Sequence, residues 1–213
     1  MPTPNNDGQD QGELLDVLPT PDHMGPQTDE ARLPFLLAAN TDGRFRTITR
    51  RDAHARGAWH RSVGLWLYTA DGDVVLQKRS HLKDTNPGKW QMSVAGHVAS
   101  GQSVLDAVLS EAHEELGIKL KESDVEFVIV SAKSESGHTE RFGKYVDSEY
   151  KCMFISKIER QDFKVNDMEV SAYEYRNMHD AFNRFRMKDT NYCPMTEQYA
   201  DIADTAIMNA LKR

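Results

Sequence analysis

Residues 96–118 read GHVASGQSVLDAVLSEAHEELGI, the stretch with the clearest structural pattern in the chain. Its apolar residues recur at the spacing of one helix face, and they are Leu105, Val108, Leu109, Ala112 and Leu116. This spacing predicts a helix over 103–116 that ends at Gly117. The preceding QMSVAGHV (91–98) favours a strand, and a loop containing Gly101 follows it. The stretch therefore predicts a strand, a loop and a helix with one buried face.

The same helix carries three acidic side chains away from its apolar face. Glu111, Glu114 and Glu115 stand at positions i, i+3 and i+4, so they share roughly a 100° arc of the helix surface. Exposed like charges at this spacing repel each other by a few tenths of a kcal/mol, roughly, per pair. A divalent cation such as Mg²⁺ offsets that repulsion, because it prefers carboxylate oxygens. Taken alone, three such acids are more typical of a solvated helix face.

The flanking sequence alternates strand and helix patterns in an α+β arrangement. We expect strands over 13–18, 44–50, 62–69, 73–79, 125–131, 149–155 and 168–175, and further helices over 178–187 and 196–211. Gly72 supplies the turn of a hairpin between 62–69 and 73–79. We expect loops over 19–26, 83–89, 132–147 and 183–194, and the last two lack a recognisable specificity code. Strands around one central helix, with helices near the end, predict a layered α/β/α domain.

Composition bounds the class of protein. The 213 residues carry 26 basic and 33 acidic side chains, a formal charge of −7, which argues against a basic nucleic-acid binder. We find neither an apolar run of membrane-spanning length nor a signal-peptide pattern at the start, so we expect a soluble, cytoplasmic protein. The two cysteines, Cys152 and Cys193, are too few for a disulfide framework. We expect residues 1–12 to be a disordered lead, 13–213 one domain, and 27–50 an insertion or extension.

The 96–118 stretch resembles the Nudix box, Gly-x5-Glu-x7-Arg-Glu-U-x-Glu-Glu-x-Gly-U, in which U is a bulky aliphatic residue. Both glycines and all three helical glutamates keep their spacing over the 23 residues. The resemblance implies a Nudix-type α/β/α sandwich with a mixed β-sheet. It also implies Mg²⁺, with Mn²⁺ as an alternative, held by Glu111, Glu114 and Glu115 and by the carbonyl of Gly96. With this spacing the metal site becomes the favoured interpretation of the acidic face.

Two positions depart from the family pattern. The first Glu is Gln102 and the Arg is Ser110, two residues that typically pair with each other in the family and tie the loop to the helix. Because both are replaced, neither leaves an unpaired charge. We expect altered loop rigidity and slower turnover, not an inactive site. Restoring both residues should leave metal-dependent activity within about tenfold.

Most of the chain, from about Glu13 to Ala172, also resembles the Nudix branch that contains type I isopentenyl-diphosphate isomerase. The resemblance rests on His60-Arg61, LQKRSHLKDTNPGKW (76–90), AGHV (95–98) and YVDSEYKCMF (145–154). In those isomerases the positions matching Arg79 and Lys83 hold the substrate diphosphate. The positions matching His60, His97, Asp147 and Glu149 surround the catalytic metal, and His54 lies one residue away from another ligand position.

Two features argue against isomerisation. The isomerase uses a cysteine to handle a proton at carbon, and the matching residue here is Ala95, which has no exchangeable side-chain proton. The isomerases also lack carboxylates at the positions of Glu111 and Glu114. A hydrolase is therefore favoured over an isomerase.

The expected function is Mg²⁺-dependent cleavage of a diphosphate linkage in a nucleoside diphosphate derivative or a small organic diphosphate. We expect Glu111, Glu115 and Glu149 to be catalytic, with Glu111 or Glu149 as the general base. The expected substrate-binding residues are Arg79, Lys83, His60 and His97. Without the resemblance, exposed basic residues and structural histidines would be the simpler interpretation. An isomerase-like protein and a weakened Nudix binding module remain alternatives.

We expect a small-molecule diphosphate as the partner, and neither a nucleic acid polymer nor a membrane. Since family members are often dimers, the resemblance also allows a homodimer.

Overall fold

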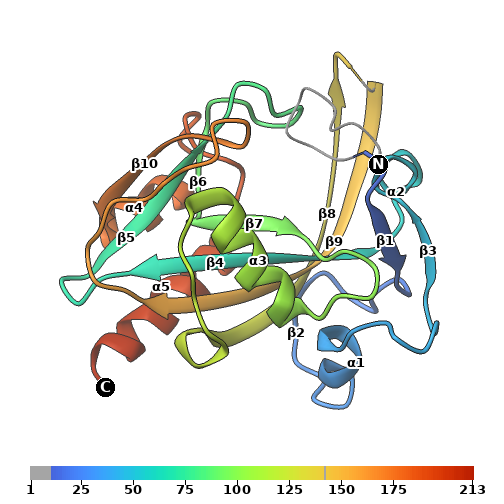
Figure 1. Cartoon of the computed structure of the whole chain (residues 1–213), viewed down its shortest axis with the longest axis horizontal. Coiled ribbons are helices and arrows are strands. Elements are labelled where there is room, and N and C mark those ends of the chain that lie inside the picture. The colour runs from blue at the N-terminus through green and yellow to red at the C-terminus, as the bar shows by residue number, and fades with distance from the viewer. Residues whose placement is uncertain (1–10, 142) are drawn as a thin grey trace.

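A computed structural model describes residues 11–213 except 142, and Figure 1 shows its arrangement. Its strands are β1 Leu14–Val17, β2 Gly25–Gln27, β3 Arg46–Thr49, β4 His60–Tyr68, β5 Asp73–Arg79, β6 Trp90–Gln91, β7 Val94–His97, β8 Glu126–Thr139, β9 Gly143–Lys157 and β10 Val170–Asn177. Its helices are α1 Leu33–Leu37, α2 Arg50–Arg56, α3 Val104–Leu116, α4 Met178–Arg186 and α5 Glu197–Leu211, with a 3₁₀ turn η1 at Glu122–Asp124. None of the helices in this described part has the length and apolar content needed to cross a membrane.

The large sheet has the order β10-β5-β4-β9-β8-β2, with β6 paired to β5 and β7 paired to β4. Strands β4 and β9 run parallel, whereas the other pairs in this sheet are antiparallel. The sheet is therefore mixed, as the family resemblance implied. A separate pair, β1 and β3, lies beside α2 at one end of the molecule (Figure 1).

Helices cover both faces of the large sheet. Helix α3 crosses one face, and α4 and α5 cover the other (Figure 1). Strand β4 is buried along its whole length and alternates between the two cores. Val63, Leu65 and Leu67 pack with α3, whereas Trp66 and Tyr68 pack with α4 and α5. Because both faces are covered, β4 is apolar on both sides, and the predicted α/β/α sandwich is confirmed.

Helix α3 begins and ends where its sequence predicts. The Ser103 hydroxyl caps the helix by accepting a hydrogen bond from the Asp106 amide at 3.1 Å. Gly117 follows in the left-handed conformation, with φ of 68°. These two ends fix the length of the helix, and with it the position of its glutamates above the sheet.

Three expectations about local structure need correction. The turn at Gly72 is present, with φ of 80°, but β4 and β5 share a single registered pair, Tyr68 with Val74. Strand β4 instead pairs with β9 along its whole length and with β7 over residues 62–65, which leaves only its end for β5. The expected loop over 132–147 is mostly strand, since β8 and β9 continue as a long hairpin. The expected loop over 19–26 contains the start of β2.

The segment expected as an insertion, 27–50, contributes α1 and β3 and leads directly into α2. Of the expected disordered lead, residues 1–10 lie outside the described residues, and Gln11 and Gly12 form a turn before β1.

Candidate active site

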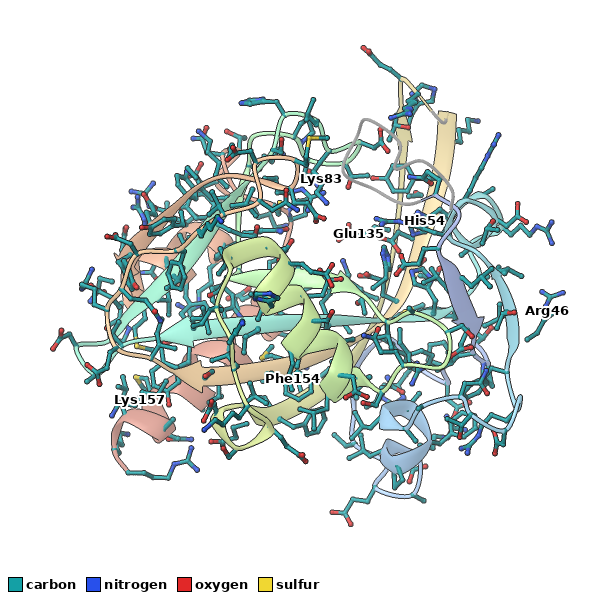
Figure 2. All side chains as sticks on the ribbon, viewed as in Figure 1. Arg46, His54, Lys83, Glu135, Phe154 and Lys157 are labelled. Carbon is teal, nitrogen blue, oxygen red and sulfur yellow. The ribbon has the colours of Figure 1, made fainter. Side chains whose placement is uncertain are left out.

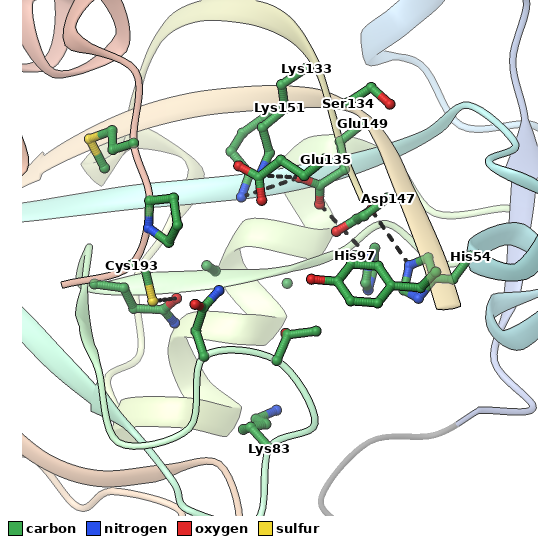
Figure 3. A pocket seen from close by; sticks show the side chains of 18 of the residues that line it. His54, Lys83, His97, Lys133, Ser134, Glu135, Asp147, Glu149, Lys151 and Cys193 are labelled. Carbon is green, nitrogen blue, oxygen red and sulfur yellow. Dashed lines mark hydrogen bonds and ion pairs between the residues drawn. The ribbon is translucent and has the colours of Figure 1, made fainter. Parts of the chain in front are cut away.

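A cavity of about 800 Å³ lies where the loop after β5, strand β7, helix α3, the β8–β9 hairpin and helix α2 meet. Lys83, Glu135 and His54 mark this region in Figure 2, whereas Arg46 and Lys157 lie on the outside. Figure 3 shows Lys83 and Cys193 across the cavity from the hairpin residues Glu135, Asp147 and Glu149. All the residues expected to act in the site line this cavity except His60 and Glu115. Those two are fully buried behind it.

An acidic cluster forms where α3 faces β7. Carboxylate oxygens of Glu111, Glu115 and Glu169 lie within 4.8 Å of one another. Glu115 is only 1% exposed and accepts hydrogen bonds from the Gln77 side-chain amide at 2.8 Å and the Ala95 backbone amide at 3.0 Å. These two bonds fix Glu115 between the helix and the sheet.

The cluster holds more negative charge than its cations neutralise. Lys83 donates to Glu169 at 2.8 Å, so one ammonium group faces three carboxyl groups. Burial, then the neighbouring charge of Glu169, raises the pKa of Glu115 to about 7. Burial and the charges of Glu115, Glu169 and Glu114 raise the pKa of Glu111 well above its usual value. Three oxygen donors with this excess charge suit Mg²⁺ or Mn²⁺.

Gly96 provides the space for this cluster. A Cβ atom placed on Gly96 would lie 1.9 Å from Oε1 of Glu111. The missing side chain therefore lets the Glu111 carboxylate approach the backbone of β7, next to the carbonyl that the family resemblance gives as a metal ligand. Gly96 thus brings the Glu111 carboxylate and the β7 backbone together at the acidic cluster.

Glu114 is placed differently from the other two helical glutamates. It is exposed, and it accepts a hydrogen bond from the Ser110 hydroxyl at 2.6 Å. The structure groups Glu111 and Glu115 with Glu169 and leaves Glu114 at the cavity wall. A change of side-chain rotamer would be needed for Glu114 to join the cluster.

The two basic residues expected to bind diphosphate have distinct environments. Arg79 donates to the Thr85 carbonyl at 2.9 Å, the Thr85 hydroxyl at 3.3 Å and the Gln91 side-chain oxygen at 3.2 Å. These bonds use three of its five N–H donors and hold the loop after β5 beside the cavity. The other two donors can serve an anion there. Lys83 sits at the acidic cluster itself, where it pairs with Glu169.

Three histidines form a second cluster at the other end of β7. The ring centroids of His54, His60 and His97 lie 4.9–5.3 Å apart, and Asp147 completes the group. Asp147 Oδ1 lies 3.4 Å from His60 Nε2 and 3.6 Å from His54 Nε2. Four atoms of this group are buried and lack a hydrogen-bond partner of good geometry within the described chain. They are Nε2 of His54, His60 and His97 and Oδ1 of Asp147.

These unpaired atoms fit a metal ion, because buried polar atoms normally have partners. The His60 Nδ1 lies 2.8 Å from the Ala58 carbonyl, so that this nitrogen donates and Nε2 faces the cluster. Burial lowers the pKa of His54 to about 4 and that of His97 well below its usual value, so both rings stay neutral as ligation requires. Burial would also lower the pKa of His60, but the carboxylate of Asp147 outweighs it and raises that pKa.

Glu149 belongs to a network of charges beside this cluster. Its carboxylate lies 3.0 Å from Lys133, 3.7 Å from Lys151 and 3.8 Å from His97, as Figure 3 shows for the two lysines. Burial favours the neutral acid, but Lys133 and Lys151 outweigh it and hold the pKa of Glu149 well below its usual value. Glu149 is therefore a fixed, ionised group.

Comparison with known proteins agrees with this geometry. A family profile described as "NUDIX domain" matches residues 58–197. The chain belongs to the Nudix family. The predicted resemblance is thus confirmed at the level of the family, and helix α3 lies within the matched residues.

The chain is similar to both hydrolases and isomerases of this family. It is 30% identical over 150 residues to Nudix hydrolase 3 of Arabidopsis thaliana, covering 68% of this chain but only 19% of that protein. It is 26% identical over 144 residues to isopentenyl-diphosphate Delta-isomerase 2 of Photorhabdus laumondii, covering 68% of this chain and 77% of the relative. The crystal structure of DR0079 from Deinococcus radiodurans shares the fold, with a TM-score of 0.56 and 18% identity. The match covers 90% of this chain and 98% of that chain.

Two residues of the candidate site, Glu169 and His54, were respectively not predicted and only weakly indicated from the sequence. Glu169 stands before β10, far from the Nudix box, and no spacing rule links it to α3. It is brought there because the Asn166 amide donates to the Glu115 carbonyl at 3.1 Å. His54 was one residue away from the isomerase pattern, but α2 turns its ring into the cluster.

Neither cysteine stands at the position of Ala95 in β7. Cys152 is fully buried in β9, and burial raises its pKa to about 12. Cys193 lines the cavity, with its sulfur 3.8 Å from the Gln91 side-chain oxygen. In Figure 3 it lies on the wall opposite His97 and Asp147.

Proposed function

We propose that this chain is a divalent-cation-dependent hydrolase that cleaves the phosphoanhydride of a small-molecule diphosphate, such as a nucleoside diphosphate derivative. The observation that carries the proposal is the acidic cluster of Glu111, Glu115 and Glu169, in which Glu111 packs against the side-chain-free surface of Gly96. Similarity to Nudix hydrolases supports the same reaction class.

Glu111, Glu115 and the Gly96 carbonyl would hold Mg²⁺ or Mn²⁺, with Glu114 joining when the substrate binds. When bound, the ion would neutralise phosphate oxygens and make water a better nucleophile. Lys83 and Arg79 would hold the diphosphate in the cavity, since a forked guanidinium suits phosphate oxygens.

Of the two bases predicted from sequence, Glu111 has the better geometry. Lys133 and Lys151 lie 3.0 Å and 3.7 Å from Oε2 of Glu149, so two ammonium groups keep this carboxylate ionised and oriented toward them. Glu111 faces the cavity at Gly96, where the attacked phosphorus would lie. We therefore assign to Glu111 the acceptance of the proton from the attacking water, and to Glu149 a positioning role.

A substrate panel tests the proposal. The intact chain with Mg²⁺ or Mn²⁺ should release phosphate or a nucleoside monophosphate from at least one diphosphate. Glu111→Gln, Glu114→Gln and Glu115→Gln should each lower kcat at least 100-fold, whereas Glu122→Gln, on the exposed turn η1, should leave it unchanged. Saturable binding without turnover across the panel would contradict the proposal and point to a binding module.

Isomerisation of a prenyl diphosphate is the second candidate, because the three-histidine cluster matches the isomerase resemblance. Ala95 argues against it, since its methyl group cannot transfer a proton. Conversion of isopentenyl to dimethylallyl diphosphate, lost on His60→Ala but retained in Glu111→Gln, would establish this candidate over the hydrolase.

A further inference from the structure

The Nudix loop, residues 98–103, joins the two halves of the metal site. It leaves β7 after Gly96 and His97, and it ends at Ser103, the cap of the helix that carries Glu111 and Glu115. Any movement of this loop therefore changes the distance between the carbonyl of Gly96 and the glutamates of α3.

The pair that ties this loop to the helix in the family is absent here. The Gln102 side chain accepts a hydrogen bond from the Ala99 amide at 3.3 Å, within the loop itself. The Ser110 hydroxyl donates to Glu114 at 2.6 Å, within the helix itself. Both side chains bond locally, so neither joins the loop to α3.

A different ion pair reaches the loop from the N-terminal segment. Arg61 donates to Asp16 at 2.8 Å, and both residues are 1% exposed. The same nitrogen of Arg61 donates to the Gln102 carbonyl at 3.2 Å, and Asp16 accepts from the Ser100 hydroxyl at 2.7 Å. Each partner of the pair thus holds one residue of the loop.

Backbone contacts reinforce this connection. The Ser100 amide donates to the Leu14 carbonyl at 2.7 Å, and the Val98 amide donates to the Arg61 carbonyl at 3.0 Å. Asn40 completes the environment by donating to Asp16 at 2.7 Å, so the carboxylate is fully bonded. Asp16 and Asn40 both lie outside the residues that the family profile matches, 58–197.

We propose that Asp16 and Arg61 are the pair that positions the Nudix loop. They replace the pair that the family forms at the positions of Gln102 and Ser110. The segment before residue 58 is thereby part of the metal site. This inference rests on the proposed function only in placing the cation at the acidic cluster.

The test removes the ion pair without stranding a buried charge. In Asp16→Leu/Arg61→Met, amide hydrogen exchange over 98–103 should accelerate at least tenfold more than exchange in β8 and β9. The affinity for Mg²⁺ alone, measured by calorimetry, should fall about tenfold. Mg²⁺ is the probe because it selects oxygen donors and so reports on the acidic cluster, not on the histidines.

Two further variants separate positioning from stability. Arg186→Met/Asp204→Leu removes an ion pair between α4 and α5, and should leave the loop's exchange and Mg²⁺ affinity unchanged. Adding Gln102→Glu and Ser110→Arg to the Asp16→Leu/Arg61→Met chain should restore slow loop exchange and tight Mg²⁺ binding.

Unchanged Mg²⁺ affinity, or exchange that accelerates equally along the whole chain, would overturn the proposal. Failure of the restored pair to slow the loop would overturn the claim that the two pairs do the same work. If the double variant does not fold, Ser100→Ala removes one loop contact alone and should accelerate loop exchange several-fold. No readout needs turnover, so a chain that hydrolyses nothing still tests the pair.

Discussion

Gly96 shows how a single absent side chain can create a binding site. The neighbouring atoms that exclude a Cβ belong to the end of the Glu111 side chain, with the carboxylate carbon at 2.1 Å and both oxygens within 2.6 Å. A flexible side chain can move away, so an added methyl group would displace the carboxylate and leave the backbone in place. The glycine is thus required by the acid that faces it.

We therefore predict that Gly96→Ala folds but binds metal poorly. The free energy of unfolding should fall by less than about 2 kcal/mol, a usual size for a tolerated overpacking change. Mg²⁺ affinity, followed by calorimetry, should fall at least tenfold. Gly137→Ala is the matched control, because φ is ordinary there as at Gly96 and the nearest atoms that a Cβ would meet belong to another side chain, that of Tyr145. Mg²⁺ binding as tight as in the unmodified chain would contradict this account of Gly96.

The raised pKa of Glu115 predicts how the free energy of unfolding depends on pH in the absence of metal. Its pKa of about 7 in the folded chain exceeds the usual 4.5, so the folded state binds more protons than the unfolded state between these values. Stability from this group is therefore fully present below about pH 4.5 and is lost as pH rises to 7. The loss amounts to roughly 3 kcal/mol, since each pKa step is worth about 1.4 kcal/mol.

Glu115→Gln should remove that loss, because the amide oxygen can still accept from Gln77 and Ala95. With EDTA present, urea unfolding should show the variant more stable than the original chain at pH 8 and nearly equal at pH 5. A variant less stable at pH 8 would mean that the ionised carboxylate stabilises the metal-free fold.

Among the elements, the β8–β9 hairpin does most to assemble the second half of the cavity. Thirteen registered pairs run from Glu126–Ile155 to Thr139–Gly143, including Lys133 with Glu149. The cross-strand pair brings the ammonium group and the carboxylate to 3.0 Å. The hairpin thus places an ionised Glu149 beside His97.

Lys133→Met should destabilise the chain by about 2–3 kcal/mol at pH 7, because it takes one partner from a buried carboxylate. Lys133→Arg, which keeps the charge, should cost less. Because the pKa of Glu149 is lowered in the folded chain, its carboxylate stabilises the fold at pH values above its usual pKa. This stabilisation is lost as pH falls through the lowered pKa. The difference between Lys133→Met and the original chain should therefore shrink as pH falls below 4.5 and through the lowered pKa of Glu149, as acid-dependent urea unfolding can show.

The same elements show how far the sequence could predict the structure. Helix α3 was predictable because its apolar spacing, its Ser103 cap and Gly117 all agree. The hairpin was underestimated, since 132–148 are largely polar and lack a buried face for most of their length. Glu111 and Glu115 were predictable from the box, but Glu169 joins them through a tertiary contact that no local pattern encodes. His54 was similarly dependent on how α2 packs against β9.

At the scale of the whole molecule, the proposed metal site would couple cation binding to folding. The acidic cluster joins α3 to the segment before β10, so an ion there links elements that must separate on unfolding. Mg²⁺ at about 100 times its Kd should raise the free energy of unfolding by about 2.7 kcal/mol. The increase should be larger at pH 8 than at pH 6, because protonated glutamates must ionise to bind the ion. Urea titrations with Mg²⁺ and with EDTA measure it, and equal midpoints would contradict a folded-state metal site.

One margin of the large sheet is closed by β2, a three-residue strand that pairs Pro26 with Ser131 of β8. A proline has no amide hydrogen to donate, and so short a strand offers few backbone hydrogen-bonding groups to an added strand. Another polypeptide thus finds a poor template for strand addition along this margin. If two copies associate, they would have to meet elsewhere on the molecule, which directs crosslinking experiments away from β2.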